Sequence, residues 1–252
     1  MPSGSAPDFD HLDLAALRRR RSAKWTRYPL DVLPVWVAEM DLPLAAPVTA
    51  ALRGLVDRGD TGYPAFGGLA ESYAAFSARR FGWAPDPAAV VPVPDVVRGI
   101  ARVLELVTRP GDGVVVNPPV YPPFFGVVAG CGRRVVSSPL RRDGSGRFRL
   151  DVDDLERCFR LGARAYLLCH PHNPTGEVLG RAELAAVAAL AQRYRVTVVS
   201  DEIHAPLTSP GHRHVPFGSL DGWAPEHAVT LVSASKAWNL AGLKCALAVP
   251  GR

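Results

Sequence analysis

Val196-Thr197-Val198-Val199-Ser200-Asp201-Glu202-Ile203-His204 is a β-branched run that leads directly into two acids. Such a run predicts a short strand buried on both faces, which is typical of the parallel sheet of an α/β protein. The strand delivers Asp201 at its carboxyl end, and that edge of a sheet is where α/β proteins bind ligands. Taken alone, Asp201 is also compatible with an ordinary loop acid or a helix cap.

Two further segments place polar residues after apolar runs. The first is His170-Pro171-His172-Asn173-Pro174-Thr175-Gly176, which follows the apolar residues 165–169 and puts Asn173 at the same predicted edge. By itself, Asn-Pro-Thr-Gly is more often only a turn. The second is Ser233-Ala234-Ser235-Lys236-Ala237-Trp238-Asn239-Leu240-Ala241-Gly242-Leu243-Lys244, which holds two of the three lysines. Most lysines are solvated surface charges, but one between small hydroxyl residues can form a Schiff base close to a phosphate.

The rest of the chain alternates helical periodicity with short apolar strands. Helices are predicted over residues 46–56, 68–81, 96–108, 152–159 and 181–194, and strands over 114–116, 134–136, 165–168, 196–199, 229–232 and 245–249. This alternation predicts the α/β class, with a mostly parallel sheet covered by helices on both faces.

In their order and approximate spacing, the three segments resemble pyridoxal-phosphate enzymes of the aspartate aminotransferase fold, fold type I. Further motifs narrow the resemblance to the MalY/PatB branch of the class I/II aminotransferase superfamily, the cystathionine β-lyase or cysteine-S-conjugate β-lyase type. They are Lys24-Trp25, Leu33 to Asp41, Gly62-Tyr63, Pro118 to Phe124, Pro171 to Pro174, Ser200 to His204, and Ser235-Lys236 with Gly242-Leu243. The resemblance runs from about Arg18 to the last residue.

The resemblance implies a division into domains. Residues 1–43 would be the N-terminal part of a small domain, and residues 44–252 would form the pyridoxal-phosphate-binding large domain. Members of the family continue beyond the position of Arg252, so we expect a C-terminally truncated chain in which most of the small domain is absent.

The resemblance also implies roles for single residues. Lys236, Asp201 and Tyr121 are the expected catalytic residues: Lys236 forms the Schiff base and then acts as base at the substrate Cα, Asp201 pairs with the pyridine nitrogen, and Tyr121 stacks on the ring. Tyr121 is otherwise an ordinary core or rim aromatic. The other expected cofactor contacts are Asn173 and His204 at the ring 3-hydroxyl oxygen, Ser233, Ser235, Lys244 and the amides of Val96 and Val97 at the phosphate, and Tyr63 from a neighbouring subunit. Trp36 and Ala38 are expected on the substrate side.

Two positions depart from the pattern of the family. Asp95 stands where relatives commonly have glycine, and an acid beside a phosphate dianion is unfavourable. Asp is also a preferred N-cap, so we interpret Asp95 as the cap of the helix that begins at Val96. Glu39 replaces the more usual Asp between Ala38 and Met40, which preserves the charge of the substrate-side loop.

The function implied is a carbon–sulfur β-lyase that releases thiol, pyruvate and ammonia from cystathionine or cysteine S-conjugates. One alternative is a pyridoxal-phosphate-dependent aminotransferase, which needs an amino acceptor where elimination needs none. The other is a truncated, non-catalytic homologue that acts as a binding or dimerisation partner. The expected partners are a small amino-acid substrate and a second copy of the chain in a homodimer.

Composition excludes other classes of protein. With 252 residues, 48% of them hydrophobic, the chain can bury a full core. The net charge of +5 includes one basic run, Arg18 to Arg21, and the other arginines are scattered among acids, so we expect no nucleic-acid partner.

No apolar stretch reaches membrane-spanning length and no signal-peptide pattern is present, which favours the cytoplasm. Four separated cysteines suggest neither disulfides nor zinc, and His212-Arg213-His214 lacks a third ligand, so no metal is assigned.

Overall fold

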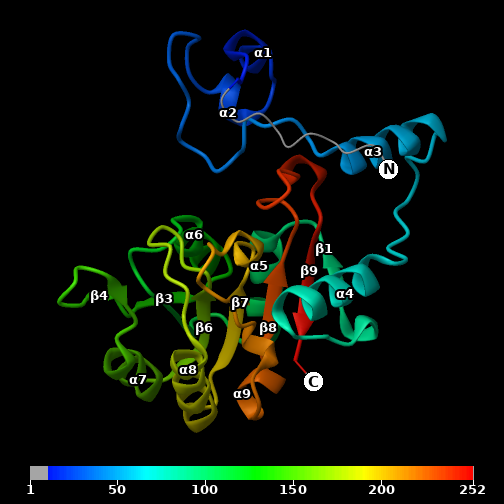
Figure 1. The fold of residues 1–252 in the computed structure, drawn as a ribbon. Helices are drawn as coiled ribbons and strands as arrows, with labels where there is room; N and C mark the ends of the chain where they lie inside the picture. Colours follow the sequence, from blue (N-terminus) through cyan, green and yellow to red (C-terminus); the bar gives the residue numbers. More distant parts are fainter. Residues whose placement is uncertain (1–10, 252) are drawn as a thin grey trace.

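The structure is a computed structural model that describes residues 11–251. Its centre is a seven-stranded sheet in the order β1-β9-β8-β7-β6-β2-β3 (Figure 1). The strands are β1 (Val91–Val93), β2 (Gly113–Val116), β3 (Arg134–Ser137), β6 (Ala163–Cys169), β7 (Thr197–Asp201), β8 (Val229–Val232) and β9 (Ala246–Pro250). β9 pairs antiparallel with both β1 and β8, and the other four pairings of this sheet are parallel, which confirms the predicted mostly parallel α/β architecture. A separate hairpin joins β4 (Arg141–Arg142) to β5 (Phe148–Arg149).

The predicted helices occur within one or two residues of their expected bounds. The helices are α1 (Leu14–Arg18), α2 (Ala23–Thr26), α3 (Ala46–Asp57), α4 (Leu69–Phe81), α5 (Val96–Val107), α6 (Pro123–Gly130), α7 (Val152–Arg160), α8 (Arg181–Tyr194) and α9 (Trp223–Glu226). β1 and α6 were not predicted from the sequence, and neither were the short elements α1, α2, α9, β4 and β5. Pro92 interrupts the β1 pattern, and α6 begins at a proline and contains two glycines, which are poor helix formers.

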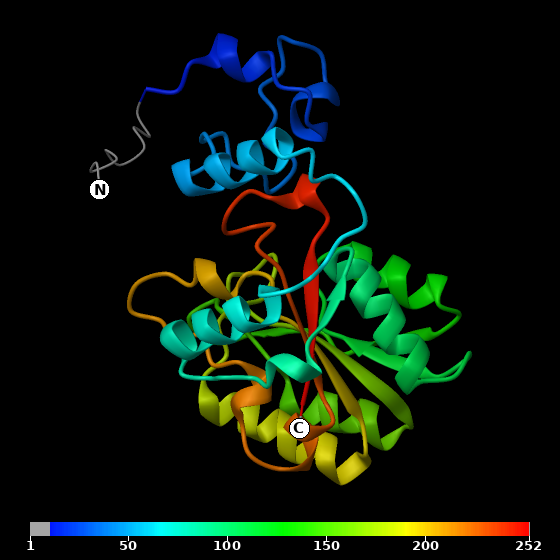
Figure 2. The ribbon, with the colours of Figure 1, turned by 90° about the vertical axis from the view of Figure 1, so that its right-hand side faces the viewer.

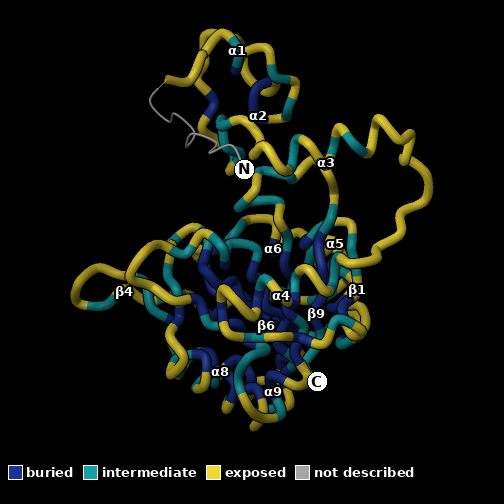
Figure 3. Tube along the Cα trace, turned by 45° about the vertical axis from the view of Figure 1, so that its right-hand side comes forward, coloured by how far each residue is buried: buried dark blue, intermediate teal, exposed yellow. Residues whose placement is uncertain are grey.

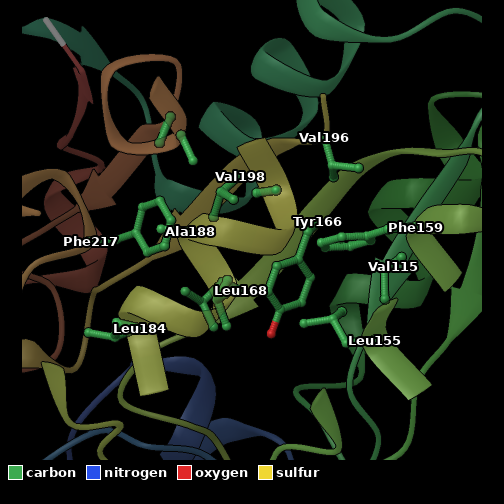
Figure 4. Close-up of a cluster of buried hydrophobic side chains, with 14 of the residues drawn as sticks. Val115, Leu155, Phe159, Tyr166, Leu168, Leu184, Ala188, Val196, Val198 and Phe217 are labelled. Carbon is green, nitrogen blue, oxygen red and sulfur yellow. The ribbon is translucent and has the colours of Figure 1, made fainter. Parts of the chain in front are cut away.

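Helices cover both faces of the sheet because its strands alternate their side chains. On β6, Ala165 and Leu167 pack with α5 and α6, whereas Tyr166 and Leu168 point to the opposite face. That second face is covered by α7, α8 and α9, and Figure 4 shows Leu184 and other apolar side chains of this layer around Tyr166. The hydroxyl of Tyr166 donates to Asn117 Oδ1 at 2.6 Å, so its burial leaves no unmet polar group.

The helix α5 lies directly against β8. Gly99 makes this approach possible, since a Cβ there would clash with Leu231 Cδ1 and lie 3.1 Å from Val93 Cγ2. The close packing holds the N-terminus of α5 at the carboxyl edge of the sheet.

The N-terminal helices α1, α2 and α3 lie beyond the sheet, beside the loop that joins β8 to β9 (Figures 1 and 2). Most of this part is exposed, whereas the sheet is buried (Figure 3). Its small core contains Trp25 and the aliphatic stem of Lys24, whose Nζ lies 2.7 Å from Asp41 Oδ2. Across residues 11–251, no helix has the length and apolar character needed to cross a bilayer.

Candidate active site

Four parallel strands, β2, β6, β7 and β8, end at one edge of the sheet, and a predicted site residue lies at or after the end of each. Tyr121 follows β2, Asn173 follows β6, Asp201 is the last residue of β7, and Lys236 follows β8. The register pairs Cys169 with Asp201 and Asp201 with Leu231, so the central three strands end level with one another. The convergence predicted from the strand pattern is therefore present.

Asp201 is a buried carboxyl group, 5% exposed, at the centre of this edge. Its Oδ1 accepts a hydrogen bond of 3.1 Å from the amide of Ile203. Burial raises the pKa of Asp201 to about 7; the hydrogen bond from the Ile203 amide opposes this shift, the charge of Glu202 adds to it, and the charge of Lys236 opposes it more weakly. A carboxylate in this setting is stabilised by a further cation, and a protonated ring nitrogen is such a group.

Lys236 lies on the loop between β8 and β9, and its Nζ donates to the carbonyl oxygen of Ala38 at 3.4 Å. The shape of this loop is set by two serines. Ser233 Oγ donates to the carbonyl of Cys245 at 2.7 Å and accepts from the amide of Ser235 at 3.1 Å, and the two hydroxyl oxygens lie 2.6 Å apart. The lysine is thus carried on a hydrogen-bonded turn between two strands of the sheet.

Asn173 and His204 line one cavity of about 440 Å³ together with Ala38, which adjoins Lys236. The backbone amide of Asn173 donates to Cys169 Sγ at 3.3 Å, which holds the turn close to the end of β6. The pKa of His204 is lowered by burial and by the charge of Lys236, so its imidazole is favoured in the neutral form.

Tyr121 is partly buried between Asp201 and the N-terminus of α5. Burial raises the pKa of its phenol, and the charges of Asp201 and Asp95 raise it further. Its ring meets Phe124 edge to face at 5.9 Å between centroids. The phenol remains protonated at neutral pH and presents an aromatic surface beside Asp201.

The first turn of α5 carries Val96 and Val97 and is capped by Asp95. The Oδ1 of Asp95 accepts from the amide of Arg98 at 2.8 Å, which confirms the interpretation of Asp95 as a helix cap. Its Oδ2 lies 3.3 Å from Lys244 Nζ. The lysine expected at the phosphate is therefore paired with the acid that also caps the helix.

Two predicted residues lie outside this cluster. The side chain of Tyr63 is fully exposed, on the segment between α3 and α4. Trp36 packs within the N-terminal part, where the guanidinium of Arg27 lies 4.6 Å from its ring and its Nε1 donates to the carbonyl of Lys24 at 3.3 Å. Of the two substrate-side residues, only Ala38 contacts Lys236.

A buried polar cluster behind Asp201 was not predicted. Glu202 accepts from Ser200 Oγ at 3.0 Å and from the Phe217 amide at 2.8 Å, and its Oε2 lies 2.8 Å from His214 Nε2. The ring of His170 stacks on His214 at 4.5 Å, and burial lowers the pKa of His170 to about 4. The position of Glu202, directly after the buried strand β7, was the one feature of the sequence that could have indicated this cluster. His214 is thus a partner of Glu202, and residues 11–251 contain no cluster of three metal-ligating side chains.

These residues fit pyridoxal phosphate. The buried Asp201 suits a cationic ring nitrogen, and the N-terminus of α5 with Lys244 suits an anion. The amine of the half-buried Lys236 makes a long hydrogen bond of 3.4 Å to the Ala38 carbonyl and is the group suited to a covalent bond with the cofactor aldehyde. The close pair between Lys244 and Asp95 is the one feature that competes with a phosphate.

The model of the family "aminotransferase class I and II" matches residues 31–249. The chain belongs to this family. A Mycobacterium leprae protein that carries the provisional name cystathionine beta-lyase is 48% identical over 253 residues, which are 97% of this chain and 61% of that protein. The cystathionine beta-lyase of Corynebacterium glutamicum is 38% identical over 235 residues, which are 93% of this chain and 62% of the relative.

A solved structure agrees with these relatives. Cystalysin from Treponema denticola, which contains pyridoxal 5'-phosphate, matches with a TM-score of 0.85 and 26% identity, over 92% of this chain and 61% of cystalysin. The family resemblance and its pyridoxal phosphate dependence are thereby confirmed. The chain spans about three fifths of the length of the curated relatives it matches.

Proposed function

We propose that the chain provides the cofactor-binding part of a carbon–sulfur β-lyase that releases thiol, pyruvate and ammonia from cystathionine or a cysteine S-conjugate. The observation that carries the proposal is the convergence of Asp201, Asn173, Tyr121 and Lys236 at one sheet edge, with a buried acid close to a half-buried lysine. The names of two relatives, both cystathionine beta-lyase, support elimination as the proposed reaction over other reactions of this cofactor.

Bound pyridoxal phosphate supplies an electron sink for the pair left when the Cα proton of an amino acid is removed. In this proposal the carboxylate of Asp201 holds a proton at the ring nitrogen, and Asn173 donates to the ring 3-hydroxyl oxygen. Tyr121 packs against the ring, and His204 contacts the same hydroxyl oxygen from the neighbouring loop. Each of these groups orients the ring or keeps it charged, and none of them removes the substrate proton.

Lys236 is the proposed base at Cα. Its amine lies 3.4 Å from the carbonyl oxygen of Ala38, where the proposed substrate-side segment meets the sheet edge. Ser233, Ser235, Lys244 and the amides of Val96 and Val97 are the proposed phosphate contacts, and Trp36 and Ala38 the proposed substrate contacts. A thiolate on the substrate Cβ would be the leaving group of an elimination, and the electron sink that bound pyridoxal phosphate would supply serves transamination as well.

An aminotransferase is the second candidate, because relatives with this activity in their names also match. One is named as an N-succinyldiaminopimelate aminotransferase of Mycobacterium tuberculosis, at 38% identity over 196 residues. Keto-acid dependence separates the two reactions, since only transamination needs an amino acceptor.

We further propose that residues 1–43 belong to a small domain and residues 44–252 to the large domain, and that the enzyme works as a cytoplasmic homodimer. The full exposure of Tyr63 supports a role in the site of a neighbouring subunit. Sedimentation of the protein with and without Tyr63→Ala tests the dimer.

The proposed function is tested by trapping and by turnover. Pyridoxal phosphate is added, fixed with borohydride, and located by mass spectrometry among the three lysines. Pyruvate release from cystathionine is then measured, with and without a keto acid, for the chain itself and for the chain extended with the remaining part of the Corynebacterium glutamicum relative. Label at Lys24 or Lys244 would reject the assignment of Lys236, and strict keto-acid dependence would reject the lyase.

A further inference from the structure

Asn239 joins two segments that lie far apart in the sequence. Its Nδ2 donates to the carbonyl of Met40 at 3.0 Å, and its Oδ1 accepts from the amide of the same residue at 3.1 Å. The side-chain amide therefore pairs with both backbone groups of one residue. Asn239 also has φ 57°, a left-handed conformation that Asn tolerates better than most residues.

This pairing of the Asn239 side chain with the Met40 backbone is called the Asn239 clamp below. It bears on the position of the turn that carries Lys236. The amide of Trp238 donates to the carbonyl of Ala234 at 3.1 Å, and the amide of Leu240 donates to that of Ser235 at 3.1 Å. Since these bonds tie both sides of position 239 to the residues around Lys236, a fixed side chain at 239 restricts where the lysine lies.

The other partner of the clamp is held by the N-terminal part. Arg20 donates to the carbonyls of Met40 at 3.3 Å, Asp41 at 2.7 Å and Leu42 at 3.3 Å. Asp41 also accepts from Trp25 Nε1 at 2.9 Å and lies 2.7 Å from Lys24 Nζ. Met40 is thus held on one side by Arg20, which lies between α1 and α2, and on the other side by Asn239 alone among the side-chain hydrogen bonds of the described residues.

We propose that Asn239 is a positioning residue that holds the segment of residues 38–40 against Lys236, so that substrate-side backbone and lysine amine keep a fixed relation. This inference deepens the proposed function and rests on it. The hydrogen bond of 3.4 Å between Lys236 Nζ and the Ala38 carbonyl agrees with this role of Asn239. Asn239 itself contacts neither the lysine amine nor the proposed ring partners through its side-chain amide, so its effect is indirect.

The competing explanation is that Asn239 only provides the left-handed turn. Asn239→Gly separates the two, because glycine adopts φ 57° without strain but has no amide to pair with Met40. Arg195→Gly is a matched control, since Arg195 also has a left-handed φ of 54°, at the C-cap of α8 and far from Met40 in the fold.

Hydrogen exchange of the Met40 amide in the cofactor-free protein measures the clamp. Loss of two neutral hydrogen bonds should speed this exchange about tenfold in Asn239→Gly, with amides of β7 unchanged. Competitive acetylation then measures the reactivity of the Lys236 amine. Lys236 should react several-fold faster relative to Lys244 in the variant, and pyridoxal phosphate should bind about fivefold more weakly by visible absorbance. Arg195→Gly should change none of these.

Exchange of Met40 at the wild-type rate in Asn239→Gly would show that the clamp is not formed. Faster exchange with unchanged acetylation of Lys236 would show that the clamp does not position the lysine. Both tests use the cofactor-free protein, so they stand even if the wild-type chain fails to take up pyridoxal phosphate, a result that would count against the proposed function instead.

Discussion

Replacing Asp201 with Asn should remove a large pH dependence of stability from the cofactor-free protein. In the folded chain, burial raises the pKa of Asp201 from 3.8 to about 7. Between these two values the unfolded chain has lost the proton of Asp201 while the folded chain keeps it. The unfolded state binds fewer protons in this window, so the free energy of unfolding falls as the pH rises.

The magnitude follows from the size of the shift. About three pKa units at about 1.4 kcal/mol each give a loss of about 4 kcal/mol, fully developed above pH 7 and absent below pH 3.8. This loss is a large part of the free energy of unfolding of a whole domain, which is typically about 5 to 15 kcal/mol. Because Asn cannot ionise, the variant should lack this contribution while keeping a polar group of similar size beside Ile203.

The assay is urea unfolding at intervals from pH 4 to pH 8, for the wild type and Asp201→Asn, without cofactor. Other titrating groups are common to both proteins, so the difference between the two curves isolates Asp201. Saturating pyridoxal phosphate should flatten the wild-type curve, since a ring cation lowers the pKa of its carboxylate partner. Parallel curves from pH 4 to pH 7 without cofactor would refute the argument that Asp201 is buried without a sufficient cationic partner.

Three further outcomes are expected. Lys236→Ala should abolish borohydride-resistant cofactor while leaving reversible binding measurable by dialysis; retained covalent label would disprove the assignment. Asp95→Asn should keep the helix cap but release Lys244, so the variant should bind pyridoxal phosphate several-fold more tightly at equal thermal stability. Asp95→Gly should bind it more tightly too, but its free energy of unfolding should fall by about 1 kcal/mol or less because the cap is lost. Unchanged or weaker affinity in both variants would show that Asp95 does not oppose the phosphate. Gly99→Ala should lower the free energy of unfolding by about 1 to 3 kcal/mol through its clash with Leu231, measured by urea unfolding, and a neutral effect would show that α5 shifts at little cost.

Much of the fold followed from local pattern, and the failures have local causes. Long amphipathic segments such as α5 and α8 were predicted almost to the residue, because a repeat of 3.6 residues over more than two turns is hard to produce by chance. β1 and α6 were missed because they are short and contain proline or glycine, and their structure comes from packing against β9 and α5. Tertiary contacts overrode weak propensity in both.

By itself, the sequence determined the class of fold and the edge at which the site lies. Parallel strands bring their carboxyl ends to one edge, so a residue placed after each strand must meet the others there, as Asp201, Asn173 and Lys236 do. Only the tertiary structure decided how these groups are protonated, paired and held in place. The pKa of Asp201 depends on burial, the pairing of Lys244 with Asp95 spans 149 positions of the chain, and the clamp of Asn239 on Met40 spans 199. Such distances are set by the packing of whole elements, and no local pattern encodes them.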